Sequence, residues 1–366
     1  MKLVTVVGAR PQFVKAATVS RAISEFNKSK SRLGITESII HTGQHYDPNM
    51  SDIFFEEMDI PKPTYSLGIG GSLHGAMTGR QLEAIEEILI EEKPNCVLVY
   101  GDTNSTLAGA LAAAKLCIPV AHVEAGLRSF NMAMPEEINR ILTDQISSLL
   151  FCPTEVAVSN LKNEGFIKKS CRVLNSGDVM LDAAIYYKSK ARKPNIKGLT
   201  RAGFVLVTIH RADNTDNLER LVQIVDALNE IAKTSVVVLP LHPRTKKMLA
   251  HYGLNLNALV TAPLSYFEML WLLEHCNLVM TDSGGLQKEA YFFDKPCITL
   301  RDQTEWTELV DTGANLLVGA DYKAIITAWS AFSSNKIEVK PLQQKLYGHG
   351  QAANFIVDAL YMNFTG

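Results

Sequence analysis

The sequence lacks the residue spacings that usually mark metal and disulfide sites. Its six cysteines are scattered along 366 residues without a Cys-x-x-Cys pair. Several lie in apolar, strand-like runs, as Cys96 does, and we expect all six to be structural thiols. The histidines show no HxH or HExxH spacing. We therefore expect no bound metal.

An excess of charge of either sign is also missing. The chain has 36 lysines and arginines against 38 aspartates and glutamates. Bulk electrostatics therefore does not favour nucleic acid, and any anion must be held by local groups. No apolar run reaches the roughly 18–20 residues that cross a bilayer, and the N-terminal residues lack a signal-peptide layout. We expect a cytoplasmic protein with neither a nucleic acid nor a membrane as partner.

The length and the element pattern predict two α/β domains. A chain of 366 residues is too long for one ordinary hydrophobic core. Short apolar runs alternate with helical patterns, such as those at 217–233 and 265–276, and this alternation is typical of doubly wound, Rossmann-like parallel sheets. We place the first domain at 1–176 and the second at 177–349. The expected strands cover 3–8, 96–101, 119–124, 148–152, 204–210, 235–241, 277–282 and 296–300.

Charged or glycine-rich turns follow six of these expected strands. Ligands of doubly wound sheets bind beyond the carboxyl ends of the strands, so two such sheets facing each other would enclose a cleft lined by these turns. Packing alone does not explain six such turns. They begin at Gly8, Gly101 and Glu124 in the first domain and at His210, His242 and Asp282 in the second.

The Ser283-Gly284-Gly285 turn has two interpretations. Glycines let a backbone approach a ligand closely, and the free N–H groups at a helix start favour phosphate. Glu289, about one turn into the helix, could accept hydrogen bonds from sugar hydroxyls. Alternatively, Ser283 simply caps the helix. The turn is neither a Walker loop nor Gly-x-Gly-x-x-Gly, so it supports neither an NTPase nor a dinucleotide cofactor.

Three carboxylates, Asp102, Glu124 and Glu136, are candidates for acid–base work. Asp102 follows one apolar strand, where it could instead cap the helix that starts near Asn104. Glu136 follows Pro135, where it could be a first-turn acid favoured by the helix dipole. Glu124 ends another apolar strand and needs either a partner or a function. Carboxylates gathered in a partly dry site acquire separated pKa values, as general acid–base pairs require.

The basic candidates also follow strands of both domains. An arginine at a strand-to-helix turn, such as Arg10, can grip an oxyanion with two hydrogen bonds. His210 ends a strand directly, and a structural role for this histidine stays open. The full set is Arg10, Lys15, His210, Arg211, His242 and Arg244.

At this point the motifs resemble those of the non-hydrolysing UDP-GlcNAc 2-epimerase family. The matching segments run in order through nearly the whole chain, to about residue 350. The resemblance implies two Rossmann-like domains across a cleft, as in GT-B glycosyltransferases, with a last helix at 350–366 that packs back on the first domain. It also implies a homodimer that needs no cofactor. The matching segments are 8–17, 42–50, 101–113, 122–140, 208–214, 241–245 and 281–290, followed by 301–308.

The resemblance also implies the chemistry. Breaking the anomeric C–O bond releases UDP, a base takes the proton from carbon 2, and the resulting 2-acetamidoglycal is protonated from the other face before UDP returns. Carboxylates suit such a route because they stabilise cationic character and move protons. The motif match implies that Asp102, Glu124, Glu136 and His210 are catalytic. It implies substrate contacts from Arg10, Lys15, His242, Leu264, Met269, Ser283, Gly284, Gly285 and Glu289.

Two departures from the family pattern concern the substrate. Trp306 stands where many relatives have an arginine, and Tyr46 and Asp47 follow His45 where activator-binding members have other polar and basic residues. With the 128–137 segment, these features resemble the subgroup that acts on UDP-2,3-diacetamido-2,3-dideoxyglucuronate. Arg80, Arg128 or Arg140 could pair the extra carboxylate. A UDP-GlcNAc 2-epimerase, a hydrolysing epimerase and a retaining glycosyltransferase stay open as alternatives.

Overall fold

The computed structural model describes residues 1–29, 34–44, 58, 60–199, 203–334 and 346–365, except for the side chains of Arg10 and Ser29. The chain forms two compact units, one of Met1–Ala183 with Lys345–Gly366 and one of Ala184–Gln344. Both are α/β structures built on a parallel sheet, which confirms the expected fold class. No helix among the described residues is long and apolar enough to span a bilayer.

The first unit contains a seven-stranded sheet in the order β3-β2-β1-β4-β5-β6-β7. Its central strands are buried on both faces, as their nearly continuous apolar sequences predict. The strands are β1 (Lys2–Val7), β2 (Thr36–His41), β3 (Tyr65–Ser66), β4 (Cys96–Tyr100), β5 (Val120–Val123), β6 (Leu149–Cys152) and β7 (Arg172–Asn175).

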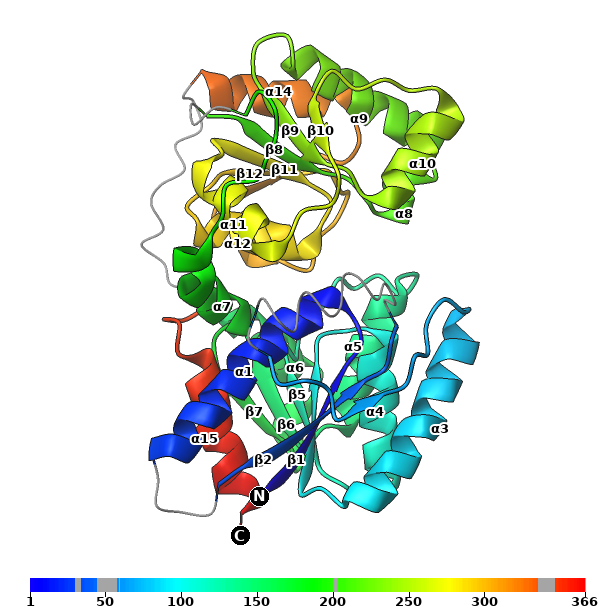
Figure 1. Ribbon diagram of the computed structural model, residues 1–366, viewed down its shortest axis with the longest axis vertical. Helices are drawn as coiled ribbons and strands as arrows, with labels where there is room; N and C mark the ends of the chain where they lie inside the picture. Colours follow the sequence, from blue (N-terminus) through cyan, green and yellow to red (C-terminus); the bar gives the residue numbers. More distant parts are fainter. Residues whose placement is uncertain (30–33, 45–57, 59, 200–202, 335–345, 366) are drawn as a thin grey trace. The chain divides into compact units, whose positions relative to one another are not determined.

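Helices cover both faces of this sheet (Figure 1). On one face α1 and α15 lie side by side, with the rings of Phe26 and Tyr361 5.0 Å apart. On the other, α3 packs on α4 and α4 on α5. The helices are α1 (Arg10–Ser29), α3 (His74–Glu92), α4 (Asn104–Lys115), α5 (Pro135–Ile146), α6 (Glu155–Asn163), α7 (Val179–Tyr187) and α15 (Ala352–Phe364), with a short 3-10 helix at Phe166–Lys168.

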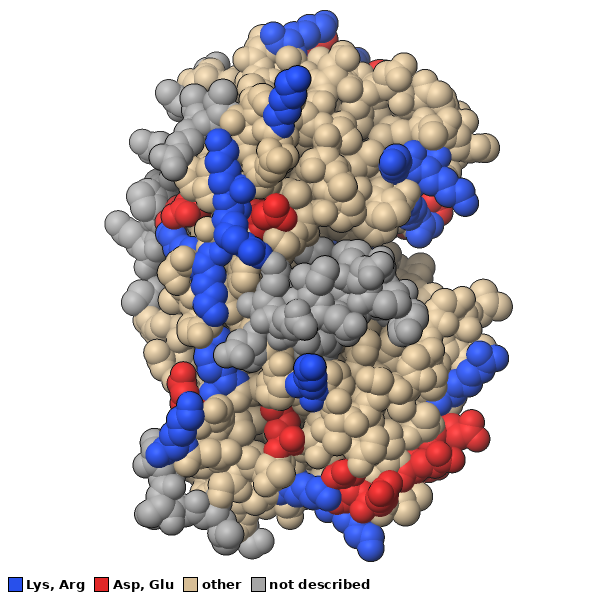
Figure 2. All heavy atoms as spheres, in the orientation of Figure 1, with Lys and Arg blue, Asp and Glu red and all other residues tan. Residues whose placement is uncertain are grey.

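Helix α3 shows how the sequence sets one of these packings. Its apolar side chains recur at helical spacing, so that Ile85 and Leu89 are buried on one side. Glutamates occupy the opposite side, and Figure 2 shows acidic side chains gathered over this helix, where Glu83, Glu87 and Glu91 are exposed. The apolar stripe thus packs against the sheet layer while the charges stay in water.

The second unit repeats the scheme with a six-stranded sheet in the order β10-β9-β8-β11-β12-β13. Helices α9 and α14 pack together over one face, and α12 contacts β11 and β12. The strands are β8 (Val205–Thr208), β9 (Val237–Pro240), β10 (Leu259–Thr261), β11 (Leu278–Thr281), β12 (Cys297–Thr299) and β13 (Asn315–Leu317). The helices are α8 (Ala212–Thr215), α9 (Leu218–Ile231), α10 (Pro243–Tyr252), α11 (Tyr266–His275), α12 (Gly284–Phe292), α13 (Thr307–Asp311) and α14 (Tyr322–Ser333), with a 3-10 helix at Lys188–Lys190.

The chain passes from the first unit to the second within α7, at Ala183–Ala184, and not at the expected 176–177. The first half of α7 stays with the first unit because Asp182 accepts a 2.8 Å hydrogen bond from the N–H of Ala353, at the start of α15. The chain returns at Lys345, slightly before the expected 350.

Four of the six cysteines are buried as expected, and two are not. Cys276 and Cys297 are buried, and this burial raises the pKa of both thiols to about 12. Cys96 and Cys152 are buried in β4 and β6. Cys117, however, is exposed, because it lies in the turn after α4 with a positive φ of 58°. Cys171 is partly exposed just before β7, so burial holds for four of the six thiols.

Candidate active site

Each sheet reverses its strand order at one point, and residues expected at the site follow the strands there. In the first unit β1 and β4 are neighbours, and Gly8 and Asp102 lie just beyond their carboxyl ends. In the second unit β8 and β11 are neighbours, followed by His210 and Ser283. Ligands of doubly wound sheets bind at such points. Each unit therefore has a candidate ligand-binding edge.

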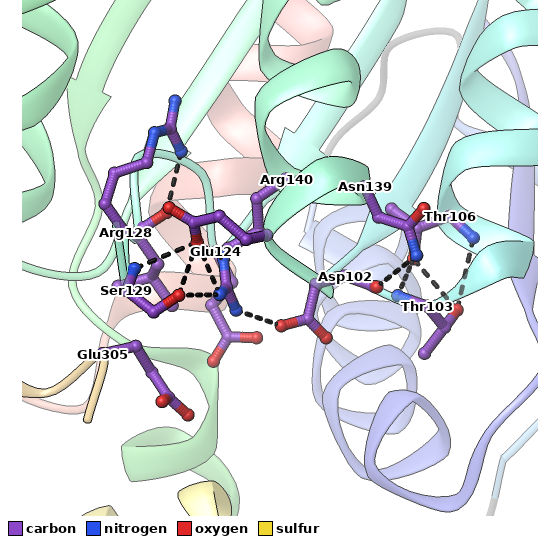
Figure 3. A network of polar contacts seen from close by, with 12 residues as sticks. Asp102, Thr103, Thr106, Glu124, Arg128, Ser129, Asn139, Arg140 and Glu305 are labelled. Carbon is purple, nitrogen blue, oxygen red and sulfur yellow. Dashed lines mark hydrogen bonds and ion pairs between the residues drawn. The ribbon is translucent and has the colours of Figure 1, made fainter. Parts of the chain in front are cut away.

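Asp102 does not cap the helix that follows it. Thr103 is the N-cap of α4, and its hydroxyl accepts the N–H of Thr106, so the capping interpretation of Asp102 is wrong. The Asp102 carboxylate instead accepts a 2.5 Å hydrogen bond from Nη1 of Arg140, toward which it points in Figure 3. Nδ2 of Asn139 donates to the backbone oxygen of Asp102 at 2.9 Å. Two residues of α5 thus fix the position of this carboxylate.

The surroundings of Asp102 alter the pKa of its carboxyl group. Burial raises the pKa of Asp102 above its ordinary value. The charge of Arg140 opposes this rise in pKa, and the charge of Glu124 adds to it. Lys15 has a smaller lowering effect and Glu136 a smaller raising effect. The three predicted carboxylates therefore interact electrostatically, as general acid–base groups do.

Glu124 ends β5 in a conformation that few side chains adopt. Its φ is 76°, in the left-handed region, where a non-glycine residue is held only by its surroundings. Its carboxylate forms an ion pair with Nζ of Lys15 from α1, and both side chains are about nine-tenths buried. The acid at this strand end therefore has the partner that its burial requires.

Glu136 and its neighbour Glu137 differ in their surroundings. Glu136 lies in the first turn of α5 and is partly exposed. Glu137 is buried and accepts hydrogen bonds from the N–H groups of Ser129 and Phe130, each at 2.9 Å. Burial acts to raise the pKa of Glu137, but these bonds and the Arg140 guanidinium hold it below its ordinary value. Glu137 therefore shapes the turn before α5, whereas the neighbouring Glu136 remains partly exposed.

The structure rules out two of the three arginines suggested for an extra substrate carboxylate. Arg140 is 2% exposed and pairs with Glu137 at 2.6 Å as well as with Asp102. Arg128 is also 2% exposed, and it pairs with Glu164 at 2.6 Å and with Asp144 at 2.8 Å. Guanidinium groups already shared between two carboxylates have little left to offer a third. Arg80 lies on an exposed side of α3.

In the second unit a buried aspartate organises the turn that carries His210. Asp282 follows β11 and is fully buried. Its carboxylate accepts the backbone N–H groups of His210, at 3.1 Å, and Arg211, at 3.0 Å, and Nδ2 of Asn214 at 3.1 Å. Nδ1 of His210 lies 3.3 Å from the same carboxylate, while the ring is partly exposed. Asp282 thus orients the histidine, and the part of the ring that faces away from Asp282 is accessible to a ligand.

His242 lies beside His210 at the next strand end. The two ring centroids are 5.7 Å apart. His242 also caps α10, because its Nδ1 accepts the N–H of Arg244 at 3.2 Å. Arg244 forms an ion pair with Asp216, so its guanidinium is already engaged. The structure therefore brings the two predicted histidines together.

The Ser283-Gly284-Gly285 turn forms the N-terminus of α12. Ser283 is the N-cap, as the structural alternative proposed, and its hydroxyl accepts the N–H of Leu286. A side chain on Gly284 would collide with the carboxylate of Glu305, whereas one on Gly285 would have no protein atom within 4 Å. The carboxylate of Glu305 therefore fills the space beside Gly284, whereas the space beside Gly285 is free for a ligand. Glu289, 9% exposed, lies further along the same helix.

The remaining predicted residues are placed as follows. Leu264 and Met269, both partly exposed, lie at the start of α11. Trp306 is buried, and the centre of its ring lies 4.1 Å from Nζ of Lys288. The tryptophan therefore packs over a cationic side chain, whereas the arginine of many relatives would itself carry the positive charge. Arg10 begins α1, but its side chain lies outside what the structure describes. The segment with His45, Tyr46 and Asp47 also lies outside the described residues.

Several residues that shape the site have no signal in the sequence. Gln12 of α1 is buried, and it accepts the N–H of Gly8 at 2.8 Å and donates to the oxygen of Tyr100 at 2.7 Å. It therefore ties the ends of β1 and β4 together. Asp282 stood out in the sequence as the start of a glycine-rich turn, but not as the residue that holds the turn carrying His210. Both act through backbone groups of segments distant in sequence, which only the fold reveals.

Comparison with known proteins gives the family. The model of the family described as UDP-N-acetylglucosamine 2-epimerase matches residues 27–361. The chain belongs to this family. The resemblance seen in the motifs is thereby confirmed, and with it the class of enzyme, an epimerase and hence an isomerase.

Individual relatives of this epimerase match over nearly their whole length. A Pseudomonas aeruginosa protein named UDP-2,3-diacetamido-2,3-dideoxy-D-glucuronate 2-epimerase is 56% identical over 361 residues, or 98% of this chain and 99% of the relative. The crystal structure of Methanocaldococcus jannaschii UDP-GlcNAc 2-epimerase, in complex with UDP-GlcNAc and UDP, is 42% identical with a TM-score of 0.90, covering 99% of this chain and 100% of that one. A lipopolysaccharide outer core galactosyltransferase, 12% identical over 99% of each chain with a TM-score of 0.55, shares the fold alone, in keeping with the expected GT-B-like architecture.

Proposed function

We propose that this epimerase inverts carbon 2 of a UDP-linked 2-acetamido sugar by eliminating UDP and adding it back. The observation that carries the proposal is the electrostatic coupling of Asp102, Glu124 and Glu136 at one edge of the first sheet. Burial raises the pKa of Asp102, whereas Glu124 is paired with a buried lysine, so the two carboxylates have different surroundings. Acid–base work on two faces of one carbon needs carboxyl groups in different surroundings.

In the proposed route, the anomeric C–O bond breaks and its electron pair leaves with UDP. Positive charge builds on the sugar ring, and the carboxylates stabilise it. A carboxylate then takes the proton from carbon 2, and the electrons of that C–H bond form the double bond of a 2-acetamidoglycal. Protonation at carbon 2 from the opposite face and return of UDP to carbon 1 complete the inversion. Atoms and electrons balance without a co-reactant.

We assign the nucleotide to residues of the second unit. The open N-terminus of α12 at Gly285 suits the diphosphate, because its N–H groups and the helix dipole favour negative charge. His210 and His242 lie at neighbouring strand ends and can donate to phosphate oxygens. Glu289 is assigned to the ribose, and Leu264 and Met269 to the uracil. Arg10 and Lys15 complete the proposed substrate contacts from the first unit.

For the substrate we propose UDP-2,3-diacetamido-2,3-dideoxy-α-D-glucuronate, which is converted to its manno epimer. The 56% identity to the Pseudomonas relative of that name supports this choice, as do the Trp306 substitution and the 128–137 segment. Since Arg128 and Arg140 are engaged in ion pairs, Arg80 is the candidate of the three that can meet the additional carboxylate. The second candidate is UDP-GlcNAc, which the 42% identity to the M. jannaschii enzyme favours.

Proton NMR of UDP-sugars incubated with the enzyme alone tests the proposal. We expect the donor sugar to change into its 2-epimer without any acceptor, and the diacetamido uronate to be used with a far higher kcat/KM than UDP-GlcNAc. A glycosyltransferase would leave the sugar unchanged until an acceptor is added. A hydrolysing epimerase would release UDP irreversibly. Equal or better use of UDP-GlcNAc would replace the uronate by the second candidate.

As part of the proposal, we place the enzyme in the cytoplasm as a homodimer. There it would supply a precursor of a surface polysaccharide, such as lipopolysaccharide O-antigen or capsule. Light scattering after size-exclusion chromatography tests the dimer, which should have twice the mass of one chain. Deletion of the gene followed by analysis of surface polysaccharide tests the physiological role, and an unchanged polysaccharide would contradict it.

A further inference from the structure

We infer that His122, acting through Asp144 and Arg128, is a positioning residue. It fixes the distance between the turn that carries Asp102 and the turn that carries Glu124. This inference rests on the proposed function. His122 lies on β5 and is fully buried, so it cannot itself touch a substrate. Its effect on the reaction must pass through the backbone that it bonds.

The imidazole of His122 joins two strand ends. Its Nε2 lies 2.7 Å from the backbone oxygen of Gly101, the residue before Asp102. Its Nδ1 lies 2.7 Å from Oδ1 of Asp144. A carbonyl oxygen only accepts a hydrogen bond, and an ionised carboxylate also only accepts. Both ring nitrogens of His122 therefore donate, and the ring acts as a two-ended clamp.

Asp144 carries the connection to the turn after β5. Its Oδ2 accepts the N–H of Gly126 at 3.1 Å and Nη1 of Arg128 at 2.8 Å. Burial acts to raise the pKa of Asp144, but the bond to His122 and the charges of His122 and Arg128 hold it below its ordinary value. Arg128 is in turn fixed by two hydrogen bonds to Glu164, at 2.6 and 2.8 Å. The clamp is thus anchored at both ends.

The two turns need such support because their backbones are unusual. Gly101, Glu124 and Gly126 have φ values of 63°, 76° and 79°, all in the left-handed region. For Glu124 this conformation is unfavourable and persists only where the surroundings enforce it. His122 and Gly126 lie two residues before and after Glu124, and their hydrogen bonds to Gly101 and Asp144 hold the backbone in this conformation.

Gly101 also lies close to the Lys15–Glu124 ion pair. A Cβ added there would lie 3.2 Å from Oε2 of Glu124 and 3.3 Å from Nζ of Lys15. The backbone that His122 holds is therefore adjacent to this pair. A shift of this carbonyl would move Asp102 and the ion pair relative to each other.

A purely structural role does not account for the choice of residues. Buried ion networks contribute little net stability compared with apolar residues of similar volume, so a core needs none of these charges to fold. What the network provides is a fixed distance between two turns. A misplacement of about 1 Å at reacting groups can cost roughly a hundredfold in rate.

The test compares His122→Asn and Asp144→Asn with a matched control, Thr143→Val. Thr143 is buried next to Asp144 on α5, and its hydroxyl has no hydrogen-bond partner, so valine should be neutral. We expect His122→Asn and Asp144→Asn each to lower kcat by about a hundredfold, the scale of a 1 Å displacement, while KM and the Kd for UDP stay near wild type. The double variant should lose little more than either single variant, because both substitutions break the same connection.

Other outcomes separate this inference from the proposed function. A wild-type protein that leaves every UDP-sugar unchanged would refute the proposed function. An active wild type with active variants would refute the positioning role instead, as would folded variants that lose UDP affinity in parallel with kcat. If the variants do not fold, 15N NMR of the histidine rings in the wild-type protein decides the matter. Two protonated nitrogens on His122 are expected, and a single one would overturn the clamp.

Discussion

Arg140 holds Asp102 with one arm of its guanidinium and Glu137 with the other. Nη1 donates to Asp102 at 2.5 Å, and Nη2 donates to Glu137 at 2.6 Å. Because Glu137 is itself bonded to the backbone of the 129–130 turn, the arginine couples the position of that turn to the carboxylate after β4. The positive charge also opposes the rise in the pKa of Asp102 that burial causes.

Replacing Arg140 by Gln should therefore shift the pH dependence of the reaction. Loss of the positive charge raises the pKa of Asp102 further, so the limb of the pH–kcat profile that Asp102 controls should move to higher pH. The direction is the same whether Asp102 acts as acid or as base. Arg172→Gln, at an exposed position on β7, removes the same charge as a control and should leave the profile unchanged. An unshifted profile for Arg140→Gln would show that Asp102 does not control that limb.

Single replacement of Asp102 by Asn, of Glu124 or Glu136 by Gln, or of His210 by Asn should lower kcat by about a hundredfold or more, the scale for acid–base groups. UDP binding, measured by calorimetry, should survive in the Asp102, Glu124 and Glu136 variants because it is assigned mainly to the second unit. His210→Asn should weaken it as well, because His210 is assigned to the diphosphate. Glu83→Gln, on the exposed face of α3, is the control. Near-normal turnover of Glu124→Gln would remove that residue from the mechanism.

The sequence predicts much of this site because its catalytic candidates stand at strand ends. Glu124 stood out as an acid closing an apolar strand, and all eight expected strands overlap a strand of the structure. The strands that it missed, β2, β3, β7, β10 and β13, are short or mixed in polarity, and four of them are sheet edges. Such strands carry little apolar periodicity of their own.

Partners of charged residues were much harder to predict than their positions. Lys15 was expected to contact substrate, and the structure pairs it with Glu124, 109 positions away. Arg128 and Arg140 looked available for a substrate carboxylate, but both are buried in ion pairs. Which charges meet depends on which strands and helices become neighbours, and the residue types alone do not contain that information.

Substitution of Gly285 by Ala tests the proposed diphosphate position. Among the described residues, no atom beyond the adjoining backbone of α12 lies within 4 Å of the added methyl group, so the thermal midpoint should stay the same or rise slightly. A diphosphate at this helix start would meet the methyl group, and the Kd for UDP should rise about tenfold or more. Gly284→Ala differs because it also displaces Glu305. Unchanged UDP affinity in Gly285→Ala would place the diphosphate elsewhere.

The stability of the first unit should depend on pH through Asp144. Its folded-state pKa is depressed, so its stabilisation is complete above the unfolded-state pKa of about 4 and is lost as pH falls through the lower folded-state value. The wild-type melting temperature should fall below about pH 4. Asp144→Asn should melt lower at neutral pH, because removing one member of a buried ion pair costs about 3–5 kcal/mol, and should lose less on acidification. Parallel pH curves for both proteins would contradict this.

The most direct test of the account follows carbon 2 during turnover in deuterium oxide. With UDP-2,3-diacetamido-2,3-dideoxy-glucuronate and the enzyme alone, we expect the manno epimer to carry deuterium at carbon 2, and the recovered substrate to acquire it through the reverse reaction. Proton NMR detects both as loss of the carbon 2 proton signal. Epimer that keeps its original proton through many turnovers would contradict proton removal by a carboxylate that exchanges with solvent, and with it the elimination route.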